Sequence, residues 1–125
     1  MAHHSRKEFF PYLKEKLGDV PFSVDEHNEG PWNNAKKAWA MFDTEAKYHV
    51  VIQDDAIICN DFMKRAEDIL MGSKAEAFSF YFGDRSPLKR LADRGMQDGF
   101  IELKGLHWGV AICLSTKLIP YMLKY

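Results

Sequence analysis

The sequence predicts an α/β protein in which helices cover both faces of a mainly parallel sheet. Three observations support this prediction. First, apolar runs typical of strands alternate along the chain with amphipathic segments of about ten residues. Second, one of these runs is continuously apolar, without polar residues at every second position. Third, the chain contains no repeat or linker. Strands and helices in this order are typical of right-handed βαβ units. The length of 125 residues fits one domain, residues 1–125.

Five segments have helical patterns. The first begins with a capping-box pair, Ser5 and Glu8, and ends near Gly18, while Pro11 predicts a kink or a later start. In the second, apolar residues recur at helical spacing and place Trp39 on a buried face. The segments are residues 5–19, 34–47, 62–72, 86–95 and 116–125.

Four segments have strand patterns. They are residues 20–26, 49–55, 77–83 and 99–115, the last giving one or two strands. The continuously apolar run at 49–55 favours a central strand covered on both faces. Because almost no strand precedes the first helix, we expect the domain to be incomplete at one or both ends, as a shortened version of a larger fold. An incomplete sheet edge would favour a homo-oligomer.

An acidic pair, Asp54 and Asp55, interrupts apolar residues at the end of the strand at 49–55. Adjacent carboxylates are costly where water is scarce unless a cation or a basic neighbour compensates them. In open α/β sheets ligands bind beyond the carboxyl ends of the strands. Two carboxylates there suit Mn²⁺ or Mg²⁺, with substrate phosphates and water completing the coordination shell. The alternative is a solvated turn that caps the next element.

Composition narrows the function classes. The hydrophobic content of 46% argues against disorder, and the formal net charge of −1 predicts no nucleic-acid partner. No apolar run approaches the roughly 20 residues of a membrane span, and the first residues do not resemble a signal peptide. Cys59 and Cys113 lack zinc-site spacing and are expected to be buried, reduced thiols. We therefore expect a cytoplasmic protein.

Three stretches together resemble a known family. They are "GPWNNAKKAWAMF" at 30–42, "VVIQDDAIICNDF" at 50–62 and "GLHWGVAICLSTKLI" at 105–119. They are similar to the nucleotide-sugar domain of glycosyltransferases with the Rossmann-like GT-A fold, and most similar to the bacterial lipooligosaccharide-type enzymes. The resemblance spans about Ser5 to Leu123 and implies a bacterial or phage protein. It implies a metal-dependent transfer of a hexose from a nucleoside diphosphate sugar to a carbohydrate or other hydroxyl acceptor.

The resemblance also implies roles for individual residues. Asp55 would bind the metal directly, and Asp54 would assist it and contact the ribose or sugar hydroxyls of the donor. Asp25 would contact the nucleoside. Ser5 and Arg6 would lie near the base and the phosphates.

On the acceptor side, His107 would be a further metal or phosphate contact, and Trp108 a platform on which a sugar stacks. No catalytic base can be singled out among Asp84, Asp98 and Glu102. The sequence also departs from the family: its first strand is nearly missing and its length is short.

Two rival interpretations remain open. The first is a non-catalytic relative that binds a nucleotide sugar or serves as an assembly module. The second is an unrelated α/β protein whose acidic pair serves phosphoryl transfer, as in a response-regulator receiver domain. That class needs a further acidic pair after its first strand and a lysine after a late strand. Lys104 is a candidate for the lysine, but the N-terminal residues contain no acidic pair.

Overall fold

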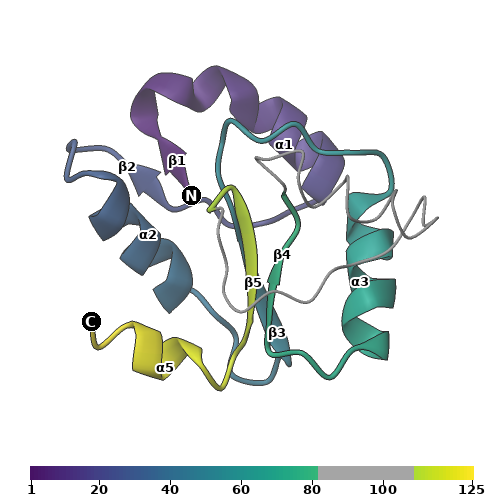
Figure 1. The fold of residues 1–125 in the computed structure, drawn as a ribbon. Coiled ribbons are helices and arrows are strands. Elements are labelled where there is room, and N and C mark those ends of the chain that lie inside the picture. The colour runs from purple at the N-terminus through teal and green to yellow at the C-terminus, as the bar shows by residue number, and fades with distance from the viewer. Residues whose placement is uncertain (82–108) are drawn as a thin grey trace, which may run out of the picture.

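The computed structural model describes residues 1–81 and 109–125, which form short strands and helices around one three-stranded sheet (Figure 1). The elements are β1 (Ala2–His3), the 3₁₀-helix η1 (His4–Phe9), α1 (Phe10–Leu17), β2 (Val24–Asp25), α2 (Pro31–Ala40), β3 (Tyr48–Ile52), α3 (Phe62–Gly72), β4 (Ala77–Ser79), β5 (Ala111–Ser115) and α5 (Ile119–Met122).

The prediction of one mainly parallel, Rossmann-like sheet is wrong. In the described part of the chain, β1 and β2 form a two-stranded parallel sheet, while β3, β5 and β4 form a separate antiparallel sheet in that order. Because β5 is antiparallel to both of its neighbours, β3 and β4 run in the same direction. The connection through α3 therefore has the direction expected of a βαβ unit, but β5 lies between its two strands. A local hydrophobic pattern does not specify this insertion.

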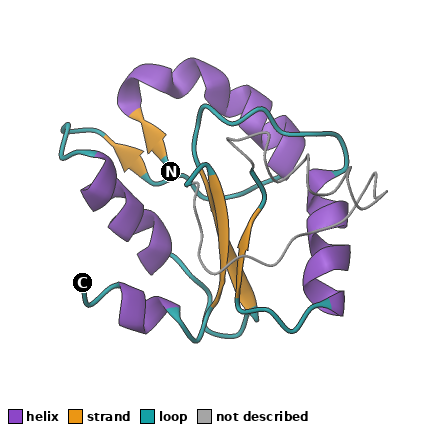
Figure 2. Cartoon of the chain, viewed as in Figure 1, coloured by secondary structure: helices purple, strands orange, loops and turns teal. Residues whose placement is uncertain are grey.

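Helices lie on both faces of the three-stranded sheet (Figure 2). On one face, Ala38 and Trp39 of α2 form the core with Val51 of β3 and Ile119 of α5. On the other face, the ring of Phe62 in α3 packs edge-on against Phe80, with centroids 5.4 Å apart. The buried face of α2, including Trp39, is the one that the helical spacing predicts.

The segment at 5–19, where Pro11 predicts a kink or a later start, forms two successive helices. A 3₁₀-helix comes first, with a kink at Arg6 (φ −111°, ψ 21°), and α1 follows with Pro11 in its first turn, where a missing N–H costs little. The cap of the 3₁₀-helix is His3, whose ring accepts the N–H of Ser5, so Ser5 is not the capping residue. Gly18, at φ 80°, ends α1 in a conformation that favours glycine.

The two cysteines differ in environment. Cys113 in β5 is fully buried, whereas Cys59 is exposed, which contradicts the expectation of two buried thiols.

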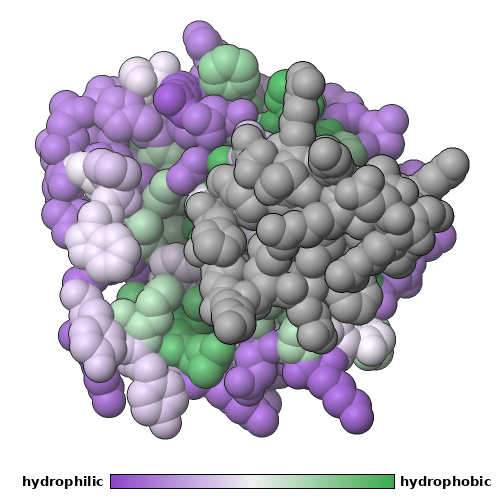
Figure 3. All heavy atoms as spheres, viewed as in Figure 1, coloured by the Kyte–Doolittle hydropathy of each residue, from purple (hydrophilic) through white to green (hydrophobic). Residues whose placement is uncertain are grey.

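In the face shown in Figure 3, hydrophilic side chains dominate the outer rim and hydrophobic ones gather near α5. Of the helices that the structure describes, none is sufficiently long and apolar to cross a membrane.

Candidate functional site

A cavity of about 400 Å³ lies where the start of the chain meets the end of β3. It brings together five residues that the sequence analysis singled out: Ser5, Arg6, Asp25, Asp54 and Asp55. The remaining lining residues are Met1, Ala2, His3, Asn28, Gly30, Pro31, Asn34 and Gln53. The predicted site residues thus come from three segments separated by about 20 to 30 residues of sequence and lie around one cavity.

Two backbone contacts hold the start of the chain against β3. The ammonium of Met1 donates to the carbonyl of Ile52 at 2.9 Å, and the N–H of His3 donates to Oδ2 of Asp54 at the same distance. The prediction of a central strand covered on both faces is wrong for β3: in the described part of the chain it lies at the edge of its sheet, and of its residues only Val51 is buried. The chain turns after Ile52. Asp54 and Asp55 therefore lie in this turn, directly opposite β1.

Arg6 binds both members of the acidic pair. Its Nη1 lies 3.0 Å from Oδ1 of Asp54 and 3.1 Å from Oδ2 of Asp55. The side chain of Asp54 is only 8% exposed, whereas those of Arg6 and Asp55 are 43% and 55% exposed. The hydrogen bond to Asp55, followed by the charge of Asp54, raises the pKa of Arg6 above its usual value. A basic neighbour thus compensates the paired carboxylates.

Asp25 closes the loop that forms another wall of the cavity. Its side chain is buried, and its two oxygens accept the N–H groups of Glu29 and Gly30 at 2.9 and 3.0 Å. The bond from Glu29 is the main cause that lowers the pKa of Asp25. The carboxylate is therefore committed to holding this loop, and its contact with a nucleoside stays a prediction.

His3 and Asn28 complete the cavity, and sequence reasoning missed both. Nδ1 of His3 lies 2.7 Å from Oγ of Ser5, and Nε2 lies 2.8 Å from Oδ1 of Asn28. Because Nδ1 also accepts the N–H of Ser5, the tautomer that satisfies all these contacts carries its proton on Nε2. The position of His3 two residues before Ser5 was a weak signal. The left-handed backbone of Asn28 (φ 55°) gave none.

Asn34 anchors β1 from the first turns of α2. Its Nδ2 donates to the carbonyl of Ala2 at 2.7 Å, and its Oδ1 accepts the hydroxyl of Ser23 at 2.6 Å. Asn34 and Ser23 are both buried, so these bonds are largely shielded from solvent. The sequence analysis treated Asn34 as the start of a helix. The helix in fact begins at Pro31, and the amide of Asn34 fixes the segment that leads to His3 and Arg6.

The acidic pair offers the hard oxygen donors that Mn²⁺ and Mg²⁺ prefer. The guanidinium shared by Asp54 and Asp55 indicates that positive charge is favourable between them. In residues 1–81 and 109–125, no group of three or more His, Cys, Asp and Glu side chains could hold a metal ion. Metal binding by Asp54 and Asp55 stays a prediction.

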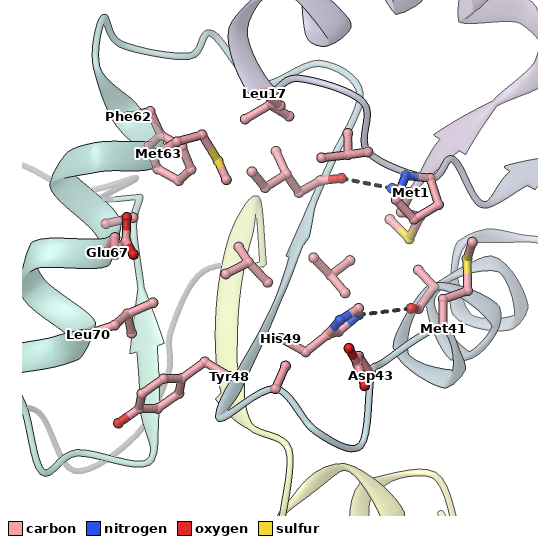
Figure 4. Close-up of a pocket in the computed structure, with 18 of the residues that line it drawn as sticks. Met1, Leu17, Met41, Asp43, Tyr48, His49, Phe62, Met63, Glu67 and Leu70 are labelled. Carbon is pink, nitrogen blue, oxygen red and sulfur yellow. Dashed lines mark hydrogen bonds between the residues drawn. The ribbon is translucent and has the colours of Figure 1, made fainter.

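A second and larger cavity, of about 930 Å³, lies between β3 and the helices α1 and α3 (Figure 4). Its walls are mostly apolar, and Leu17, Phe62, Met63 and Leu70 contribute to them. His49 lies at this wall, where its Nε2 donates to the carbonyl of Ala38 at 3.1 Å and burial lowers its pKa. This hydrogen bond connects β3 to α2.

Several sequence predictions fall on residues 82–108, outside the described part of the chain. They concern the helix at 86–95, the acceptor-side residues His107 and Trp108, Lys104 of the receiver-domain interpretation, and the base candidates Asp84, Asp98 and Glu102. The described residues do not test these predictions. Comparison with known proteins adds no identification, because no protein-family model, curated protein or solved structure matches this chain.

Proposed function

We propose that this protein binds a nucleoside diphosphate sugar together with Mn²⁺ or Mg²⁺ and transfers the hexose to a hydroxyl acceptor. The observation that supports this most is the meeting of Asp54, Asp55, Arg6 and Ser5 around one cavity. These are the residues to which the resemblance assigns the cation and the donor. Their juxtaposition depends on contacts between segments about 50 residues apart, which no local sequence pattern requires.

Each residue around the cavity has a distinct role in this proposal. Asp55, the more exposed carboxylate, would hold the cation, and the buried Asp54 would assist it and contact the donor's hydroxyls. Arg6 supplies a guanidinium that matches phosphate oxygens in pairs. The bound cation would neutralise the charge that develops on the diphosphate as it leaves the sugar. Ser5 and the amide of Asn28 offer hydrogen bonds at the rim.

Binding of the donor's diphosphate tests the proposal directly. Mn²⁺ is titrated by calorimetry into the protein in the presence of UDP or GDP, for the wild type, Asp55→Ala and Asp19→Ala. Asp19 is an exposed loop aspartate outside the cavity, so this control matches the change in charge. We expect Mn²⁺-dependent nucleotide binding in the wild type and Asp19→Ala, and a loss of at least about tenfold in Asp55→Ala, as expected for one charge-assisted ligand.

Transfer is tested separately from binding. UDP- and GDP-hexoses are incubated with the protein, Mn²⁺ and simple sugar acceptors, and the release of nucleoside diphosphate is measured. Release that requires Asp55 supports the enzyme. Metal-dependent binding without release would favour the non-catalytic nucleotide-sugar-binding module instead. If neither nucleotide binds, or if binding is the same in Asp55→Ala, the proposal is wrong.

A further inference from the structure

We infer that Arg6 acts as an internal cation for the acidic pair, so that metal ion and diphosphate bind cooperatively by displacing it. This inference rests on the proposed function, since it concerns how the same site is loaded. In addition, Arg6 pairs with the carboxylates before metal ion and diphosphate bind, and with the phosphates afterwards.

The contact geometry supports this role. A single nitrogen of Arg6, Nη1, lies about equally far from both carboxylates, at 3.0 Å from Asp54 and 3.1 Å from Asp55. Positive charge is thus already placed between Asp55, which would hold the metal ion, and Asp54, which would assist it. The buried carboxylate of Asp54 has a second donor, the N–H of His3, which would keep its orientation if Arg6 left.

The guanidinium is also free enough to leave. The side chain of Arg6 is 43% exposed and projects from a kink in η1. By contrast, the neighbouring Lys7 points elsewhere, with its Nζ 3.0 Å from Oε1 of Glu26. Of these two adjacent basic residues, therefore, Arg6 contacts the acidic pair and Lys7 does not.

Charge explains why the two ligands should help each other. A divalent ion that arrives alone must compete with Arg6 for the carboxylates and leave the guanidinium without an anionic partner. A diphosphate that arrives alone meets two carboxylates of its own sign. When both arrive together, Arg6 exchanges carboxylate oxygens for phosphate oxygens, a geometry that suits its paired donors. Coupling between two such ligands is typically about 5- to 150-fold in affinity.

The test measures Mn²⁺ affinity without any catalytic assay. Free Mn²⁺ is followed by its electron paramagnetic resonance signal during titration of the wild type, Arg6→Ala, Arg6→Gln and Lys7→Ala, each with and without UDP or GDP. A titration of the nucleotide without protein gives the Mn²⁺ that the nucleotide itself binds, and this amount is subtracted. Lys7→Ala is the matched control because it removes the same charge from the adjacent residue. Thermal melting of each variant verifies that it is folded, and Arg6→Gln keeps a polar side chain of similar length if Arg6→Ala is unstable.

In the wild type and Lys7→Ala, we expect Mn²⁺ to bind weakly alone and at least about 5-fold more tightly with nucleotide. In Arg6→Ala and Arg6→Gln, Mn²⁺ alone should bind at least about 5-fold more tightly than in the wild type, and the gain from nucleotide should be smaller than in the wild type. Equal Mn²⁺ affinities in the wild type and the Arg6 variants would overturn the inference, as would a wild type without coupling. Either result leaves the proposed function standing if binding still requires Asp55, whereas binding that never requires Asp55 refutes the function itself.

Discussion

Replacing Asn34 by alanine should destabilise the protein through the start of the chain rather than through its core. The amide of Asn34 donates to Ala2 and accepts from Ser23, and all three residues are buried. In Asn34→Ala the carbonyl of Ala2 loses a buried donor, which costs about 1–3 kcal/mol. Ser23 keeps a second acceptor, the carbonyl of Asn34 at 3.2 Å, so its loss is about 1 kcal/mol. The expected total is about 2–4 kcal/mol.

The neighbouring asparagine provides a matched control. Asn33 lies in the same helix, is exposed and makes one bond, from Nδ2 to the carbonyl of Glu29 at 2.9 Å. Alanine improves the helix propensity by about 0.7 kcal/mol at either position, so this gain cancels in the comparison. At position 33 it also offsets most of the loss of one exposed hydrogen bond, about 0.5–1 kcal/mol.

Urea denaturation of both variants measures the difference. At an unchanged slope, the free energy of unfolding of Asn34→Ala should lie about 1–3.5 kcal/mol below that of Asn33→Ala. This is a substantial part of the roughly 5–15 kcal/mol typical of a domain. If the two free energies agree within about 0.5 kcal/mol, the buried amide does not anchor β1.

Two further predictions concern titratable groups. In native protein, a thiol reagent should modify Cys59 rapidly and Cys113 only upon unfolding, because Cys113 is buried and burial raises its pKa to about 12; two rapidly reacting thiols would contradict this. The lowered pKa of Asp25 means that its unfolded form takes up the proton first, so the stability it contributes is present above about pH 4 and lost as the pH falls below it. The gap in unfolding free energy between the wild type and Asp25→Asn should therefore narrow from pH 7 to pH 3, and a constant gap would contradict the assignment.

The acidic pair illustrates what could and could not be predicted about the candidate site. Two carboxylates that interrupt an apolar run need compensation, and this follows from the sequence alone. That the compensation is Arg6, 48 residues away, depends on the contacts of Met1 and His3 with the end of β3. His3 had only a weak sequence signal, its position near Ser5, and Asn28 had none, because the contact between His3 and Asn28 joins residues 25 positions apart.

The fold divides in the same way. The spacing of apolar residues and the positions of Pro11 and Gly18 indicated which segments are helical, because these effects act within a few residues. They did not fix every bound: the helix predicted at 34–47 spans Pro31–Ala40. The direction and partners of the strands were decided only in the tertiary structure. β5 is antiparallel to β3 and β4 and lies between them, and its continuous apolar face is compatible with either direction. Strand pairing is decided by non-local contacts and chain connections. The local pattern therefore indicated four segments that each contain a strand, but it missed β1 and predicted the sheet wrongly.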